Sequence, residues 1–206
     1  MIIDTKTYAA TQQNYYKTEN PKSQIVIGFS LREGHNHILR LQSKEYGKSK
    51  KWNTYTISRE GIIYQHFNPK KHSDFLGIKA ADIKIISIVL ENTGYLVRDN
   101  DGQYVNLLNE ICDADRVTMK KWDVFNYWEI FSEEQIMALV ELCNYLTIEF
   151  NIPNECIEFE NFHKSISKYR GIVFRSNYIE KGSDVNPLFD ITKFNKLLAN
   201  NDIPNI

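Results

Sequence analysis

The chain has 206 residues, of which 42% are hydrophobic and 25% are charged. This length and composition predict one globular domain with short terminal extensions. The 25 basic and 26 acidic residues give a net charge of −1, which excludes the strongly basic surface field of a typical nucleic-acid-binding or lipid-binding protein. We therefore expect neither nucleic acid nor a membrane among its partners.

Three cysteines, Cys112, Cys143 and Cys156, lie far apart in the sequence. An odd number of cysteines without a C-x-x-C pair is typical of free thiols in a reducing compartment rather than of a disulfide framework. The N-terminus lacks the apolar run of a signal peptide, and no stretch reaches the roughly 20 apolar residues of a membrane span. The sequence thus predicts cytoplasmic synthesis without a signal peptide, with incorporation into an exported particle as one possible fate.

The polarity of the chain predicts its domain organisation. Residues 1–22 are polar and predict a loosely attached N-terminal extension. Residues 23–200 carry the apolar segments and form the predicted domain, and residues 201–206 are a short tail. Inside the domain, residues 97–128 are polar and irregular in pattern, so we expect an excursion from the core there.

Apolar and β-branched runs predict the first elements in chain order. Residues 24–30 form a short apolar run that is typical of a buried strand, and residues 37–46 carry a weak helix signal. Residues 54–58 and 62–67 flank a turn that contains a glycine, which predicts a β-hairpin. Residues 83–90 are nearly all apolar, as in a central strand that is buried on both faces.

The second half of the chain continues this alternation. Ser132 and Gln135 match the ends of a capping box, and apolar residues at helical spacing follow, so we expect a helix over residues 133–150. Residues 171–174 predict a last strand, and apolar residues between 194 and 198 predict a C-terminal helix. Interleaved strands and helices indicate an α/β (α+β) domain with a single mixed central sheet flanked by helices.

Several segments occur in an order and spacing that a known family shares. They are an apolar strand running into Gly28-Phe29-Ser30, the hairpin with Ile63-Tyr64-Gln65, Phe75-Leu76-Gly77, the strand Ser87-Ile88-Val89-Leu90-Glu91, and a C-terminal segment that runs from Lys181 to Asp190. Over about residues 22–198 the chain resembles the type-2 N-acetylmuramoyl-L-alanine amidases. Peptidoglycan recognition proteins and the phage T7-type lysozyme share the fold of that family. The resemblance implies an amidase-2-like fold and a cell-wall ligand.

The resemblance also implies where a zinc site would lie. In the family, two histidines and one Asp or Cys hold zinc, and the open fourth position carries the attacking water. The first histidine corresponds to Gly28 and the third ligand to Asp184. The second histidine corresponds to Phe159 or Glu158, or to Arg175 in another register. Because Gly28 has no side chain and a single carboxylate is a poor zinc site, we expect no bound cofactor unless the zinc site is rearranged.

The resemblance further suggests catalytic and groove positions, and these are degenerate. The family's transition-state stabiliser, often a tyrosine at the start of the hairpin, corresponds to Asn53. Tyr55 lies two residues further on and would share the same strand face, so it could substitute. Glu91 retains the family's acidic residue. The residues expected to line the groove are Tyr55, Tyr64, Phe75, Arg175 and Asn177.

A relocated metal site remains open as an alternative. It would need His35 or His37 to converge with His163 and Asp184, which the sequence alone does not show. As ordinary residues, the two histidines beside Gly34 are typical of a solvated loop, and Asp184 is typical of a turn or cap.

Three functional hypotheses follow. The first is a catalytically inactive amidase-like domain that binds peptidoglycan fragments or forms a structural, protein-binding part of a larger assembly of the phage or injection-particle kind. The second is an active N-acetylmuramoyl-L-alanine amidase that cleaves the bond between N-acetylmuramic acid and L-Ala with a rearranged zinc site. The third is a partner-binding protein that uses the fold as a scaffold, with residues 97–128 as its interface.

Overall fold

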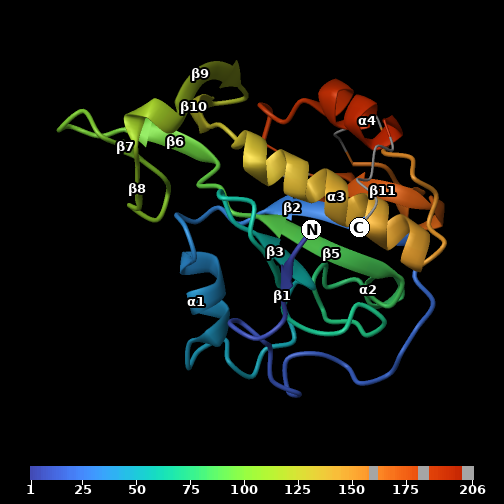
Figure 1. Cartoon of the computed structure of the whole chain (residues 1–206). Coiled ribbons are helices and arrows are strands. Elements are labelled where there is room, and N and C mark those ends of the chain that lie inside the picture. The colour runs from blue at the N-terminus through green and yellow to red at the C-terminus, as the bar shows by residue number, and fades with distance from the viewer. Residues whose placement is uncertain (158–161, 181–185, 201–206) are drawn as a thin grey trace.

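The computed structural model describes residues 1–157, 162–180 and 186–200, and it is built around one central sheet (Figure 1). The six strands of this sheet run in the order β1-β4-β3-β5-β2-β11. They are β1 (Ile3–Asp4), β2 (Gln24–Phe29), β3 (Tyr55–Ile57), β4 (Ile63–Gln65), β5 (Ile85–Leu90) and β11 (Gly171–Phe174). Strands β3, β5, β2 and β11 are parallel to one another, while β4 is antiparallel to β3. The predicted mixed central sheet is confirmed.

The two central strands show why this sheet forms. All six residues of β2 and all six residues of β5 are buried, and the two strands pair residue by residue from Gln24 with Ile85 to Phe29 with Leu90. Parallel strands that are covered on both faces need such continuous apolar runs. The sequence prediction of two buried strands is therefore confirmed, with bounds that differ by one or two residues.

Helices cover both faces of the central sheet (Figure 1). On one face lie α3 (Glu133–Glu149) and α4 (Ile191–Ala199), and on the other lie α1 (Asn36–Gln42) and α2 (Lys79–Asp82). Short 3-10 helices occur at 114–116, 166–168 and 175–178. Both long helices, α3 and α4, were expected from the sequence.

The start of α3 ties this helix to the sheet. Ser132 is the N-cap, and its hydroxyl accepts a hydrogen bond from the Gln135 amide at 3.1 Å. The Gln135 side chain does not bond to the backbone amide of Ser132, as it would in a complete capping box. It donates instead to the carbonyls of Ile57 and Glu91, at 2.9 and 3.0 Å. The capping box is thus half formed, because the glutamine bonds to the ends of two strands.

The alternation along β2 assigns each side chain to a face. Ile25, Ile27 and Phe29 belong to the main core, which also includes the buried residues of α3 and α4. Val26 belongs to a second core cluster, with Ala81 of α2. Successive side chains of a strand point to opposite faces, so Gly28 faces the same side as Val26.

The N-terminal segment is attached to the sheet, which differs from the loose extension expected from its polarity. Strand β1 pairs with β4, the amide of Ala10 donates to the carbonyl of His66, and the amide of Tyr16 donates to the carbonyl of His72. These contacts are mostly backbone hydrogen bonds. Such bonds need no apolar pattern, and this explains why composition alone missed them.

The predicted excursion is an ordered second sheet, which we call the protruding sheet (Figure 1). Its strand order is β8-β7-β6-β10-β9. The antiparallel strands are β6 (Tyr95–Arg98), β7 (Tyr104–Val105), β8 (Ile111–Cys112), β9 (Val117–Trp122) and β10 (Phe125–Glu129). A cluster of aromatic rings stabilises one side of it, since Tyr95 stacks on Phe125 and both rings contact Trp128. The strands are short and largely solvent-exposed, so the sequence carries no clear alternation for them.

Two further expectations can be compared with the structure. All three cysteines are free thiols, as predicted. Among the residues that the structure describes, no helix has both the length and the apolar character needed to cross a membrane.

Candidate functional site

The candidate site lies on the face of the central sheet that α1 covers. Gly28 of β2 pairs with Val89 of β5 near the carboxyl ends of these strands, and both residues are buried. Glu91 directly follows β5, so the strand places its carboxylate at the carboxyl end of the parallel strands. Ligands of open α/β sheets bind at this end of the sheet.

A histidine and a glutamate form the central pair of the site. The Nδ1 atom of His35 lies 2.6 Å from Oε1 of Glu91, so the imidazole donates to the carboxylate. The Glu91 side chain is only 2% exposed, whereas that of His35 is 38% exposed. Burial raises the pKa of Glu91, and the hydrogen bond from His35 partly offsets that increase. The pair therefore presents a half-exposed imidazole that is backed by a buried carboxylate.

Two tyrosine rings enclose this imidazole. The ring centre of His35 is 5.5 Å from that of Tyr8 and 5.6 Å from that of Tyr64, and the two tyrosine rings are 4.9 Å apart. Tyr64 is a predicted groove residue, whereas Tyr8 belongs to the segment that was expected to be a loose extension. Sequence analysis missed Tyr8 because no motif marks it.

A chain of buried hydrogen bonds occupies the neighbouring part of the same face. Nδ1 of His66 donates to the Tyr8 carbonyl, and its Nε2 accepts from the Thr56 hydroxyl, both at 2.8 Å. Nδ2 of Asn53 donates to the Thr56 hydroxyl at 2.8 Å, and Oδ1 of Asn53 accepts from Nε2 of His37 at 3.0 Å. Burial lowers the pKa of both His37 and His66 to about 4. Both histidines are thus neutral at pH 7, and these polar atoms bond to one another.

Tyr55 lies on the opposite side of the sheet from the Asn53 side chain. Its ring is buried in the main core against α3, its hydroxyl donates to Oε1 of Gln65 at 3.2 Å, and burial raises its pKa. Asn53 precedes β3 and does not follow its alternation, whereas Tyr55 is the first residue of that strand. The even spacing therefore does not put the two side chains on one face, and Tyr55 does not reach the groove.

Of the remaining groove candidates, Arg175 and Asn177 directly follow β11, and Phe75 lies between β4 and α2. The guanidinium of Arg175 lies over the half-buried ring of Phe75, 5.3 Å from its centre. The positive charge of Arg175 also contributes to the lowered pKa of His37, so the two residues are close. Asn177 is buried, and its Oδ1 accepts from the Phe174 amide at 2.7 Å. Its side chain therefore stabilises the end of β11.

Several positions expected to matter for zinc cannot be placed. Glu158, Phe159 and Asp184 lie outside the described residues. His163 is exposed, its Nδ1 accepts from the Ser165 amide, and its own amide donates to the carbonyl of Asn177.

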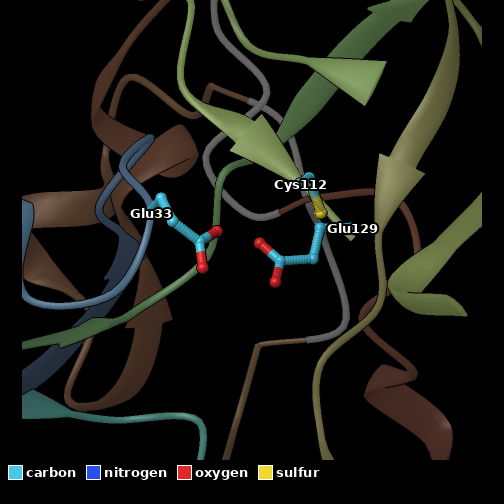
Figure 2. Close-up of side chains that lie close together, drawn as sticks. All are labelled: Glu33, Cys112 and Glu129. Atoms are coloured by element: carbon cyan, nitrogen blue, oxygen red, sulfur yellow. The ribbon is translucent and has the colours of Figure 1, made fainter. Parts of the chain in front are cut away.

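One group of potential metal ligands is present among the described residues. Ligand atoms of Glu33, Cys112 and Glu129 lie within 4.8 Å of one another, and no other such group of three occurs in that part of the chain. Figure 2 shows the two carboxylates turned toward each other with the thiol beside Glu129. Sequence analysis did not predict this group, because its members are widely separated in the chain.

The surroundings of this group favour a network of ion pairs over a metal site. Arg116 contacts Oε1 of Glu33 at 2.8 Å and Oε1 of Glu129 at 3.4 Å, and Arg59 contacts Glu129 at 2.8 Å. Burial raises the pKa of Cys112 to about 11, so the thiol stays protonated at neutral pH. Metal binding needs a thiolate and free carboxylates. This group therefore does not fit a zinc ion.

Comparison with known proteins identifies the fold. No protein-family model matches the sequence, and no curated protein matches it significantly. Among solved structures, N-acetylmuramoyl-L-alanine amidase LysC from Clostridium intestinale has a TM-score of 0.58 and 12% identity, over 97% of this chain and 98% of that chain. The E. coli amidase AmiD, in complex with anhydro-N-acetylmuramic acid-L-Ala-D-gamma-Glu-L-Lys, has a TM-score of 0.56 and 16% identity, over 88% of this chain and 59% of that chain.

A third similar structure comes from an animal protein. Drosophila peptidoglycan recognition protein SA has a TM-score of 0.50 and 10% identity, over 87% of this chain and 83% of that chain. Identities this low show the fold alone. The order of strands and helices and these structures agree: the chain has the fold of the type-2 N-acetylmuramoyl-L-alanine amidases and peptidoglycan recognition proteins.

Proposed function

We propose that this chain is an amidase-like domain that binds peptidoglycan fragments without hydrolysing them. The observation that carries this proposal is Gly28, a buried residue without a side chain at the position that corresponds to the family's first zinc histidine. The fold is shared with an amidase whose structure contains a muropeptide. A retained fold with a lost metal ligand favours binding over zinc-dependent hydrolysis.

The chemistry of the described residues supports this choice. A catalytic zinc ion needs three protein ligands and an open position for water. His66 uses both ring nitrogens within the protein, and His37 uses its Nε2. The carboxylates of Glu33 and Glu129 pair with Arg116, and the thiol of Cys112 stays protonated. Neither these two buried histidines nor this group of three residues therefore fits a catalytic zinc ion.

The same face offers groups that suit a muropeptide. The part-exposed ring of Tyr8, supported by the buried ring of Tyr64, provides flat apolar surface against which a sugar can pack. The half-exposed imidazole of His35 can bond an amide or hydroxyl of the ligand, and the guanidinium of Arg175 suits a stem-peptide carboxylate. The ligand class that we propose is therefore an N-acetylmuramoyl peptide.

A binding titration tests this proposal. We expect anhydro-N-acetylmuramoyl tripeptide to bind the wild-type protein in calorimetry, and we expect His35→Gln to weaken binding about fivefold, the equivalent of about 1 kcal/mol. His72→Gln is the matched control, because His72 is also a part-exposed histidine in ring contact with a tyrosine, Tyr16. If the wild type binds no muropeptide at millimolar concentration, the proposal is wrong.

A second candidate is an active amidase with a rearranged zinc site, and one observation favours it. A zinc-binding histidine usually donates its second ring nitrogen to a carboxylate, and His35 donates Nδ1 to Glu91. Metal analysis distinguishes the two candidates. Zinc bound in a 1:1 ratio that is lost in both His35→Ala and Asp184→Ala, but kept in His72→Ala, would establish the second candidate and overturn the first.

A further inference from the structure

The contacts within the loop that carries His35 are too few to stabilise its conformation. This loop runs from Ser30 at the end of β2 to α1, and two of its residues have positive φ, Leu31 at 57° and Gly34 at 47°. The left-handed conformation at a leucine costs roughly 1–2 kcal/mol. Few hydrogen bonds form within the loop itself: the Ser30 hydroxyl accepts from the Arg32 amide and donates to the Arg32 carbonyl, and the Asn36 amide donates to the carbonyl of Glu33. Contacts from elsewhere must therefore stabilise it.

Glu110 of the protruding sheet provides most of these contacts. Its Oε1 accepts from Nη1 of Arg32 and from Nδ2 of Asn36, each at 3.1 Å. Its Oε2 accepts from the amide of Glu33 at 3.0 Å and from Nδ2 of Asn106 at 2.8 Å. Burial raises the pKa of Glu110, but these hydrogen bonds and the charge of Arg32 outweigh burial and hold the pKa below its usual range. One carboxylate thus bonds to Arg32 and Glu33 before His35 and to Asn36 directly after it.

Glu110 is itself held firmly by the turn between β7 and β8. Oδ1 of the buried Asn106 accepts from the amides of Leu108 and Glu110, at 2.9 and 3.0 Å. Nδ2 of the same residue donates to the carbonyl of Leu31 at 3.2 Å. Because Asn106 fixes both the backbone and the carboxylate of Glu110, the turn is a rigid support for the loop.

A second connection runs parallel to the first. Arg116, just before β9, pairs with Glu33 of the loop at 2.8 Å and with the buried Glu129 at 3.4 Å. The loop therefore meets the protruding sheet at two points, one through Glu110 and one through Arg116. At its far end it places His35 against Glu91, Tyr8 and Tyr64.

We propose that Glu110 is a positioning residue of the site, and that the protruding sheet sets the geometry of His35 through it. Glu110 does not act on a ligand directly. It holds the loop so that the imidazole stays hydrogen-bonded to Glu91 and in contact with both tyrosine rings. The role in ligand binding rests on the proposed function, whereas the structural coupling from Glu110 to His35 does not.

Ring-to-ring nuclear Overhauser effects (NOEs) measure this coupling directly. In the wild type we expect a cross-peak between the rings of His35 and Tyr64 and another between Tyr8 and Tyr64, since both pairs are in contact. Glu110→Gln keeps the side-chain volume but replaces one accepting oxygen with a donating NH₂ group, so two of its four hydrogen bonds are lost. We expect the His35–Tyr64 cross-peak to weaken to less than half in Glu110→Gln and to disappear in Glu110→Ala.

Two controls separate positioning from a general loss of structure. The Tyr8–Tyr64 cross-peak should persist in both variants, because Tyr64 lies in β4 and the Tyr8 carbonyl bonds to His66, and neither contact involves the loop. Asp115→Asn removes an exposed carboxylate of the same region and should leave both cross-peaks unchanged. If Glu110→Ala unfolds, both cross-peaks are lost together, and the result for Glu110→Gln decides.

An intact His35–Tyr64 cross-peak in folded Glu110→Gln and Glu110→Ala would overturn the positioning role. The binding experiment has a separate outcome. If the wild type binds muropeptide, we expect Glu110→Gln to weaken binding by a factor similar to that of His35→Gln. If the wild type does not bind, the proposed function fails, while the cross-peaks still decide the role of Glu110.

Discussion

The hydrogen bonds of His66, beside the candidate site, favour the neutral form of its imidazole. Its Nδ1 can only donate to a carbonyl, so Nε2 must accept from the Thr56 hydroxyl. A protonated ring would donate to Thr56 as Asn53 already does, so the Thr56 hydroxyl proton would lose its acceptor on His66. The hydrogen bonds of Thr56 therefore favour the uncharged form of His66.

This network predicts acid sensitivity. The pKa of His66 falls from an ordinary value near 6.5 in the unfolded chain to about 4 in the folded protein. Above pH 6.5 neither state binds the proton, and below it the unfolded state binds first, so stability falls as pH drops toward 4. For His66 alone, we expect the free energy of unfolding to be about 2 kcal/mol lower at pH 5 than at pH 7.5.

Urea unfolding of the wild type and His66→Gln at the two pH values measures this contribution. The variant lacks the titrating ring, so its loss of stability between pH 7.5 and pH 5 should be smaller than that of the wild type by about 2 kcal/mol. His37 titrates in both proteins and cancels from the comparison. Equal losses in the two proteins would mean that His66 is not held neutral.

Residues also show what a local sequence pattern contains and what it lacks. The apolar run before Glu91 predicts its place at the end of a buried strand, and the structure has Glu91 directly after β5. The sequence did not indicate that His35 is the partner of Glu91. The two residues are 56 positions apart, and the loop that carries His35 has no periodic pattern that would predict its position. Tyr55 was assigned to the groove because strand alternation was extended to Asn53, which lies before the strand begins.

At the scale of elements, the cap of α3 joins local sequence to tertiary structure. The Ser132 hydroxyl accepts from the Gln135 amide and donates to the carbonyl of Arg59 in the hairpin turn. Loss of an N-cap side chain typically costs about 1 kcal/mol. The second bond, to a turn of the central sheet, adds to that cost.

We therefore expect Ser132→Ala to lower the free energy of unfolding by about 1–2 kcal/mol in urea titrations. Ser165→Ala is the matched control, because Ser165 precedes a 3-10 helix and its side chain forms no capping bond. That control should change stability by less than about 0.5 kcal/mol. A Ser132→Ala variant as stable as the control would show that the cap does not support the helix.

Buried elements of this fold could be predicted from the sequence, because burial requires a regular pattern of apolar residues, whereas exposed elements could not. Strands β2 and β5 and helix α3 were predicted because their burial demands continuous or periodic apolar residues. The protruding sheet was read as irregular because its strands have two to six residues and mostly part-exposed faces. Backbone pairing in such strands depends on partners far away in the chain, which a local pattern does not contain.

At the scale of the whole molecule, the N-terminal segment and the protruding sheet approach the site from different sides. The segment contributes the ring of Tyr8 and the carbonyl that His66 bonds. The protruding sheet contributes Glu110 and Arg116, which hold the His35 loop. The site is therefore completed by parts of the chain outside the central sheet.

Deletion of residues 1–10 tests the first of these contributions. The deletion removes β1, which pairs with Ile63 and Tyr64, and the amide of Ala10, which donates to the carbonyl of His66. We expect amide hydrogen exchange to become faster in residues 63–66, while the amides of β2 and β5 keep their protection. Unchanged exchange in β4 would mean that the segment is only loosely attached.

We propose that this chain keeps the amidase fold without its zinc chemistry, so that it binds a peptidoglycan fragment and does not cleave it. Native mass spectrometry of the wild-type protein with zinc and an N-acetylmuramoyl tripeptide tests both parts in one spectrum. We predict a complex with the mass of the protein plus one intact muropeptide, without zinc and without a released peptide that begins with L-Ala. A zinc-loaded protein together with the released peptide would contradict the account.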